Sequence, residues 1–193
     1  MPDGSSITLN AGSTLTYNQT FGQQSRDVIL EGEAYFDVMH NETVPFKVFV
    51  RESVIEVTGT SFTIRDNNGT VEVTVLSGTV QLFPTDNISR KVQIFTNQSG
   101  YLLADSEIKV KDGIDVNNLS WKTGLLSFDE TPIDSVLFDI AHHFRRELHI
   151  TTNIHNEITA EFQNQPLYEI LKEIEIVAGL KFDTTGNSLI VRQ

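Results

Sequence analysis

The chain has 193 residues, of which 14 are basic and 26 acidic, and it contains no cysteine. A formal charge of −12 disfavours binding to nucleic acid or to an anionic membrane surface, because both of those surfaces are negative themselves. The lack of cysteine excludes disulfides and thiolate metal sites. The longest apolar runs are only a few residues long, so we expect no direct membrane insertion by this chain.

Residues 1–113 are predicted to consist of short β-strands separated by glycine- and asparagine-containing turns. Asn68-Gly69 lies between two alternating runs, and this dipeptide is typical of a two-residue hairpin turn whose central residues need positive φ. About a dozen such strands occur, and no 3.6-residue apolar period is found among them. The pattern predicts a mainly β domain with an antiparallel sandwich, jelly-roll or solenoid-like architecture, and it does not choose between these three.

Residues 27–38 have the clearest alternation of the chain. One parity is apolar and the other mostly acidic, as expected for a strand with one buried face; the apolar side chains are Val28, Leu30, Ala34, Phe36 and Val38. Gly32 interrupts the run, so we expect two strands or one bent strand. Glu31, Glu33 and Asp37 have the chemistry of a hydrolase acid/base pair, but nothing nearby completes such a site, so we favour a solvated sheet face.

The spacing of apolar residues changes at about residue 114. We predict domains at residues 1–113 and 121–193, joined by a linker at 114–120. Apolar residues at helical spacing predict a helix over residues 133–144, with Thr131 as its cap and Pro132 at its first position. A second helix is predicted to begin at Pro166 and to end at Gly179.

The two predicted helices belong to an internal repeat with an offset of 34 residues, in which Phe128 corresponds to Phe162 and Pro132 to Pro166. In each copy a short strand precedes the proline and another follows the helix. Two copies with one helix each do not make a helical repeat array. We therefore predict a small α+β domain of two βαβ units with their helices on one sheet, closed by a final strand at residues 188–192.

No motif of an enzyme or of a cofactor site is found: there is no nucleophile elbow, phosphate loop or GxGxxG sequence. A zinc site built from His143, His149 and Glu147 is one alternative for the histidines. We favour histidines at a helix end, where the helix dipole stabilises a cation. We predict a structural role for Trp121, the sole tryptophan. The prediction is a binding protein rather than an enzyme, with no catalytic residues, no cofactor and no metal.

Several motifs resemble FecR-type anti-sigma regulators. The segment LEGEAYFDV at residues 30–38 is the most specific, and PDGS at 2–5, VTGTSF at 57–62 and VTVLSGTV at 73–80 continue the similarity. In the second half, the residues Trp121, Lys122, Gly124, Leu126 and Phe128, followed by the apolar helix that begins at Pro132, resemble the C-terminal domain that follows FecR in proteins of the Bacteroidetes. That domain is similar to the secretin and TonB short N-terminal fold.

The resemblance implies a periplasmic region of a regulator that one membrane helix anchors in the inner membrane. This region would sense a TonB-dependent outer-membrane transporter through the transporter's signalling domain, and would relay its state to an extracytoplasmic-function sigma factor. The family's sigma-binding cytoplasmic segment and membrane helix are absent from this chain. We expect the C-terminal domain to contact the transporter.

For this contact we predict that the last strand is an edge strand that pairs with the partner through Ser188, Leu189, Ile190, Val191 and Arg192. Two alternatives stay open at this point. One is a carbohydrate-binding domain that stacks sugars on Tyr17, Tyr35 and Trp121. The other is an outer-membrane or secretin-associated assembly module.

Overall fold

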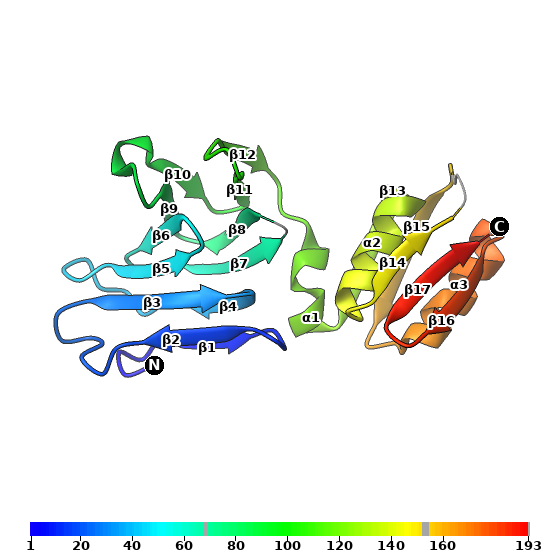
Figure 1. The fold of residues 1–193 in the computed structure, drawn as a ribbon, viewed down its shortest axis with the longest axis horizontal. Coiled ribbons are helices and arrows are strands. Elements are labelled where there is room, and N and C mark those ends of the chain that lie inside the picture. The colour runs from blue at the N-terminus through cyan, green and yellow to red at the C-terminus, as the bar shows by residue number, and fades with distance from the viewer. Residues whose placement is uncertain (68, 152–154, 193) are drawn as a thin grey trace. The chain divides into compact units, whose positions relative to one another are not determined.

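The computed structural model describes residues 1–67, 69–151 and 155–192. The chain divides into two compact units, Met1–Ile114 and Asp115–Gln193 (Figure 1). Each unit has a hydrophobic core of its own. The fold class is mainly β with an α+β part, which confirms the prediction from sequence.

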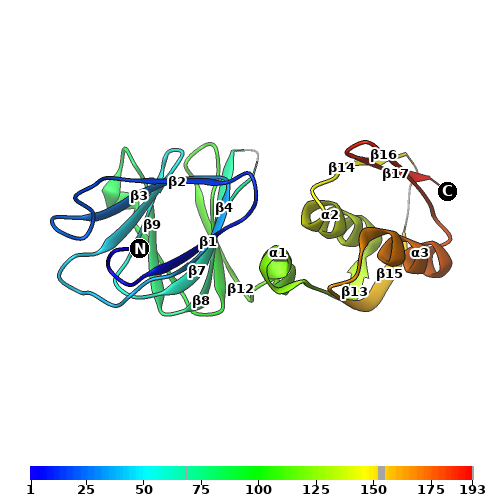
Figure 2. The ribbon, with the colours of Figure 1, turned by 90° about the horizontal axis from the view of Figure 1, so that it is seen from below.

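The N-terminal unit is a sandwich of two six-stranded sheets, which appear as facing layers in Figure 2. The first sheet has the order β1-β4-β7-β8-β11-β12 and consists of β1 (Ser6–Leu9), β4 (Glu33–Asp37), β7 (Ser61–Asn67), β8 (Thr70–Ser77), β11 (Gln98–Leu102) and β12 (Ile108–Asp112). The second has the order β10-β9-β6-β5-β3-β2 and consists of β2 (Thr14–Tyr17), β3 (Arg26–Glu31), β5 (Phe46–Val50), β6 (Ser53–Val57), β9 (Thr79–Pro84) and β10 (Val92–Phe95). A short 3-10 helix, η1 (Ile88–Arg90), lies between β9 and β10.

All strand pairs of this sandwich are antiparallel except β3 and β5, which run parallel. The two sheets bury aromatic rings against one another. Phe36 and Phe62, both from the first sheet, stack with centroids 4.9 Å apart, and the ring of Phe46 from the second sheet lies 6.2 Å from Phe36. Burial of these faces supplies the main driving force for folding of this unit.

Gly32 is the point at which the chain passes from one sheet to the other. β3 ends at Glu31 in the second sheet and β4 begins at Glu33 in the first. Gly32 has φ of +97°, and a Cβ built on it would lie 2.5 Å from the Ser13 hydroxyl. Only glycine adopts this backbone conformation in so little space. The predicted apolar parity is confirmed, because Val28, Leu30, Ala34, Phe36 and Val38 are all buried.

The β7–β8 hairpin was predicted from Asn68-Gly69. Asn67 pairs with Thr70, and Gly69 has φ of +91°, so the connection has two residues, as predicted. Asn68 itself lies outside the described residues.

The C-terminal unit has three layers. A two-stranded sheet consists of β13 (Leu125–Pro132) and β15 (Glu157–Gln163), and a three-stranded sheet has the order β14-β17-β16, with β14 (Glu147–Ile150), β16 (Lys181–Thr185) and β17 (Ser188–Arg192). Between the sheets lie α2 (Ile133–His143) and α3 (Leu167–Ala178) (Figure 2). Before β13, the short elements η2 (Val116–Leu119) and α1 (Ser120–Thr123) occupy most of the predicted linker.

Two details of the C-terminal prediction are wrong. The helices do not lie on one sheet, because the strands that precede them, β13 and β15, pair with each other, while the strands that follow them, β14 and β16, both pair with β17. Thr131 does not cap α2, since its hydroxyl bonds to the backbone of Asp129 and the N-cap position belongs to Pro132. The predicted end of α3 at Gly179 is confirmed by its left-handed conformation.

Among the described residues, no helix has both the length and the apolar character that a membrane span requires.

Candidate functional site

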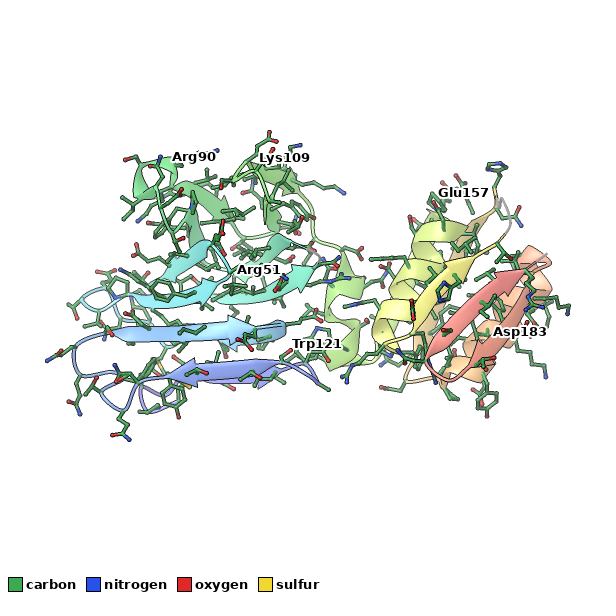
Figure 3. The ribbon with its side chains drawn as sticks, viewed as in Figure 1. Arg51, Arg90, Lys109, Trp121, Glu157 and Asp183 are labelled. Atoms are coloured by element: carbon green, nitrogen blue, oxygen red, sulfur yellow. The ribbon has the colours of Figure 1, made fainter. Side chains whose placement is uncertain are left out.

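The predicted partner-binding strand, Ser188 to Arg192, is β17, and it lies in the middle of its sheet. It pairs in parallel with β14 along one side and antiparallel with β16 along the other. Leu189 and Val191 are fully buried in the core of the unit, and Arg192 forms an ion pair with Asp183 on β16 at 3.0 Å (Figure 3). The prediction of an edge strand is therefore wrong, because both sides of the β17 backbone already have a neighbour.

The edges of this sheet belong to β14 and β16 instead. Within the described part of the chain, each of the two pairs with β17 alone. An outer strand presents alternate N–H and C=O groups that are free to pair with an extended segment. The outer sides of β14 and β16 are therefore the places in this sheet where a further strand would pair.

The acidic face of residues 27–38 does not form a catalytic pair. Glu33 is buried, contrary to the prediction of a solvated face, and its carboxylate accepts a hydrogen bond from Asn10 at 2.7 Å. Its backbone N–H donates to the Ser13 hydroxyl at 2.8 Å. Glu31 is exposed, and Asp37 accepts a hydrogen bond from Ser61. These contacts give Glu33 a structural role at the corner that Gly32 makes.

The histidines do not assemble a metal centre within the described ranges, where no cluster of three or more metal-ligating side chains occurs. His149 pairs with Glu147 at 3.6 Å on β14, whereas His143 ends α2 with its ring edge-on to Phe144. Burial lowers the pKa of His143, and the neighbouring His142 lowers it further. Both histidines lie in the last turn of α2, as predicted, but burial disfavours the cation expected at His143.

The three aromatic residues considered for sugar stacking lie on three different elements. Tyr17 lies on β2 in one sheet, with its ring 5.5 Å from that of Phe21, and Tyr35 lies on β4 in the other sheet. Trp121 lies on α1 in the C-terminal unit (Figure 3). Because β2 and β4 belong to different sheets, Tyr17 and Tyr35 do not form one sugar-binding platform.

A different polar cluster holds the start of the sandwich together. Arg26 is 2% exposed, and its guanidinium donates to the carbonyl oxygens of Val44 (2.7 Å), Met39 (2.8 Å) and Asn41 (3.2 Å) and to the carboxylate of Asp3 (3.1 Å). Burial alone would raise the pKa of Asp3, but hydrogen bonds from Ser5 and Arg26 hold it below its ordinary value. A buried arginine with these partners joins the chain start to the loop after β4, which is a structural function.

Two family models match the chain: FecR protein over residues 1–81, and FecR, C-terminal, over residues 125–191. Two crystal structures, at 1.65 Å and 2.50 Å resolution, resemble the whole chain; both are of a protein from Parabacteroides distasonis ATCC 8503 described as a "putative anti-sigma factor". Each is 27% identical and covers 100% of this chain and 92% of that one, with TM-scores of 0.78 and 0.77. No curated protein matches the chain in sequence.

The first matched range lies within the sandwich and the second within the three-layered unit, and the similar crystal structures extend over both. The first match contains the motif at residues 30–38, and the second begins within the motif at residues 121–128. The chain therefore belongs to the FecR family of anti-sigma regulators, a family of regulators rather than of enzymes.

Proposed function

We propose that this chain is the periplasmic sensor part of a transmembrane anti-sigma regulator. In this role it relays the state of a TonB-dependent outer-membrane transporter to an extracytoplasmic-function sigma factor. The observation that carries the proposal is the match of both the FecR and the FecR C-terminal models, in their usual order, to one chain. The sigma-binding step belongs to a cytoplasmic segment outside these 193 residues.

The physical character of the chain supports a protein partner. Its formal charge of −12 disfavours nucleic acid and anionic lipid. The C-terminal unit exposes apolar side chains on α3, with Tyr168 69%, Ile176 77% and Val177 70% exposed. Tyr168 lies in the first turn of α3, and Ile176 and Val177 lie in its last turn. Exposed apolar side chains at both ends of one helix are candidates for cover by another protein. We assign contact with the transporter's signalling domain to this unit.

The direct test is binding of the purified chain to the purified N-terminal signalling domain of a TonB-dependent transporter encoded beside it, measured by isothermal titration calorimetry. We expect a one-to-one complex with a dissociation constant on the order of micromolar, as is usual for transient signalling contacts. The same transporter domain titrated with the N-terminal unit alone, residues 1–114, should give no heat of binding. Absence of binding to the full chain would contradict the proposal, and hits on a glycan array would favour the carbohydrate-binding alternative.

A further inference from the structure

A groove separates α3 from the outer side of β16 in the C-terminal unit. It has a volume of about 410 Å³, and its lining residues come from α3, from β16 and from the residue before β14: Leu167, Tyr168, Leu171, Lys172, Glu175, Phe182, Thr184 and Arg146. The side chains of Leu167, Leu171 and Phe182 give it apolar walls, and charged groups stand around them. A groove between a helix and a strand edge has the form in which several domains bind an extended peptide.

The backbone of β16 faces this groove with alternate residues. Phe182 pairs with Val191 and Thr184 with Leu189, and the N–H of Phe182 points away from β17, since it donates to Glu175 Oε1 on α3 at 3.2 Å. The direction of the backbone N–H and C=O groups alternates along a strand. The N–H and C=O of Thr184 therefore point to the same side of β16 as those of Phe182, away from β17. One outward N–H of the edge is thus held by α3, and the next is open to an added strand.

The charge of the groove is opposite to that of the whole chain. Arg146 and Lys172 are its cations and Glu175 its one anion. The Glu175 carboxylate accepts the Phe182 N–H and lies 3.9 Å from Lys181 Nζ. Arg146 donates to the carbonyl oxygen of Gly186, while its Nε is buried without a hydrogen-bond partner among the described residues. The groove therefore suits an acidic ligand in a protein with a formal charge of −12.

We propose that this groove binds an extended segment of another protein, which adds to the outer edge of β16 as a further strand. The segment places apolar side chains against Leu171 and Phe182, and an acidic side chain toward Lys172 and Arg146. A second copy of this chain fits less well, because pairing of two β16 edges would bring two grooves of the same charge together. The proposed function assigns the partner to this unit, and the inference goes further because it names the groove and the kind of segment that the groove binds.

The test uses the full chain as bait for a phage-displayed library of linear peptides about ten residues long, the length of a long strand. We expect enriched peptides to alternate apolar and polar residues and to carry aspartate or glutamate. N-methylation of the peptide amides should abolish binding at one parity and leave it unchanged at the other, since only one parity faces β16. Failure to enrich any such peptide would overturn the proposal.

Two variants test whether the peptide binds in the groove. Thr184→Pro removes the outward N–H without removing a ladder hydrogen bond, so the strand should persist and affinity should fall about tenfold or more. Lys172→Glu should weaken binding at least about threefold, because it reverses a charge beside the ligand. Lys111→Glu on β12 makes the same charge change in the other unit and should leave the affinity unchanged.

Thermal unfolding and circular dichroism verify that Thr184→Pro is folded. If Thr184→Pro alone fails to fold, Lys172→Glu and the N-methylated peptides still decide the question. Equal peptide affinity for the wild type and for both variants would overturn the proposal. So would a wild-type dimer, measured by light scattering, that Thr184→Pro converts to a monomer, since a second copy would then occupy the groove.

Discussion

The two units place their apolar side chains in different ways. The sandwich buries aromatic and branched residues from both sheets in one interior, and its buried Arg26 is bonded to a carboxylate and three carbonyl oxygens. The C-terminal unit buries one face of α3 and leaves Tyr168, Ile176 and Val177 exposed on the other. The sandwich also exposes apolar side chains, such as Ile88 at 62%, but the most exposed ones lie on α3 of the second unit.

The largest effect is expected from replacing Arg26, a buried cation of the sandwich. Arg26→Leu leaves the Asp3 carboxylate and the three carbonyl oxygens without their donor, so we expect the free energy of unfolding of this unit to fall by about 4 kcal/mol. Urea unfolding followed by far-ultraviolet circular dichroism measures the loss. The control is Lys47→Leu, which removes a partly exposed pair to Glu56 at 3.3 Å and should cost less than about 1 kcal/mol. Equal losses of unfolding free energy in the two variants would mean that the buried contacts of Arg26 contribute no more than a partly exposed ion pair.

The second prediction tests the position of β17 as a central strand. Leu189 is fully buried, so Leu189→Ala should lower the free energy of unfolding of the C-terminal unit by about 3 kcal/mol. Ile190, the next residue, is half-buried on the other face of the sheet, and Ile190→Ala should cost about 1 kcal/mol. Hydrogen exchange resolves the two units separately. Similar, small losses at both positions would be expected of an exposed edge strand and would contradict the observed sheet order.

Much of the sandwich was predictable, because the physical signals are local there. The alternation at residues 27–38 identifies the buried parity, and Gly32 marks the bend between the strands. What the alternation does not reveal is that β3 and β4 belong to different sheets, since that depends on pairings with β5 and β7, which are distant in sequence. Glu33 was assigned to solvent for the same reason: its partner Asn10 lies on another part of the chain.

The C-terminal site was less predictable, because strand order is a long-range property. The last strand of a chain has no special tendency to lie at an edge, and the composition of the two strands distinguishes them. Residues 188–192 read SLIVR, an apolar run typical of a central strand, whereas residues 181–185 read KFDTT, a polar strand typical of an edge. The groove at β16 forms only where α3 and β16 come together in the folded unit, and no spacing of residues in the sequence indicates it.

The third prediction concerns the corner between the sheets. Gly32→Ala adds a Cβ at φ of +97° that would lie 3.0 Å from Ser13 Cβ and 3.1 Å from Ser13 Cα. We expect a loss of about 2 to 3 kcal/mol, from the backbone conformation together with the displaced Ser13. Gly22→Ala is the matched control, because Gly22 has φ of +84° with no atom within 4 Å of its Cβ position. It should cost only about 1 kcal/mol, so thermal unfolding should separate the two variants.

The fourth prediction uses the carboxylate that Arg26 holds. The pKa of Asp3 is lowered in the folded state from its ordinary value of 3.8, because hydrogen bonds from Ser5 and Arg26 outweigh desolvation. Its contribution to stability is therefore present above pH 3.8 and is lost as the pH falls through the lower folded pKa. Asp3→Asn should be less stable than the wild type at pH 6, and the difference should narrow toward pH 3. Urea midpoints across this range measure it; a constant difference would show that the charge of Asp3 is not involved.

The smallest expected effect is the pH dependence of stability that His143 gives to the C-terminal unit. Burial and the neighbouring His142 lower the pKa of His143 in the folded state, whereas the unfolded chain titrates near 6.5. The unfolded state therefore binds more protons as the pH falls below 6.5, and the neutral imidazole favours the folded state above that pH. The free energy of unfolding of this unit should decline between pH 7.5 and 5.5 by less than about 1 kcal/mol. His143→Gln should remove that slope in hydrogen exchange. If the free energy of unfolding instead rose toward low pH, the attraction of the helix dipole for a charged His143 would outweigh the effect of burial.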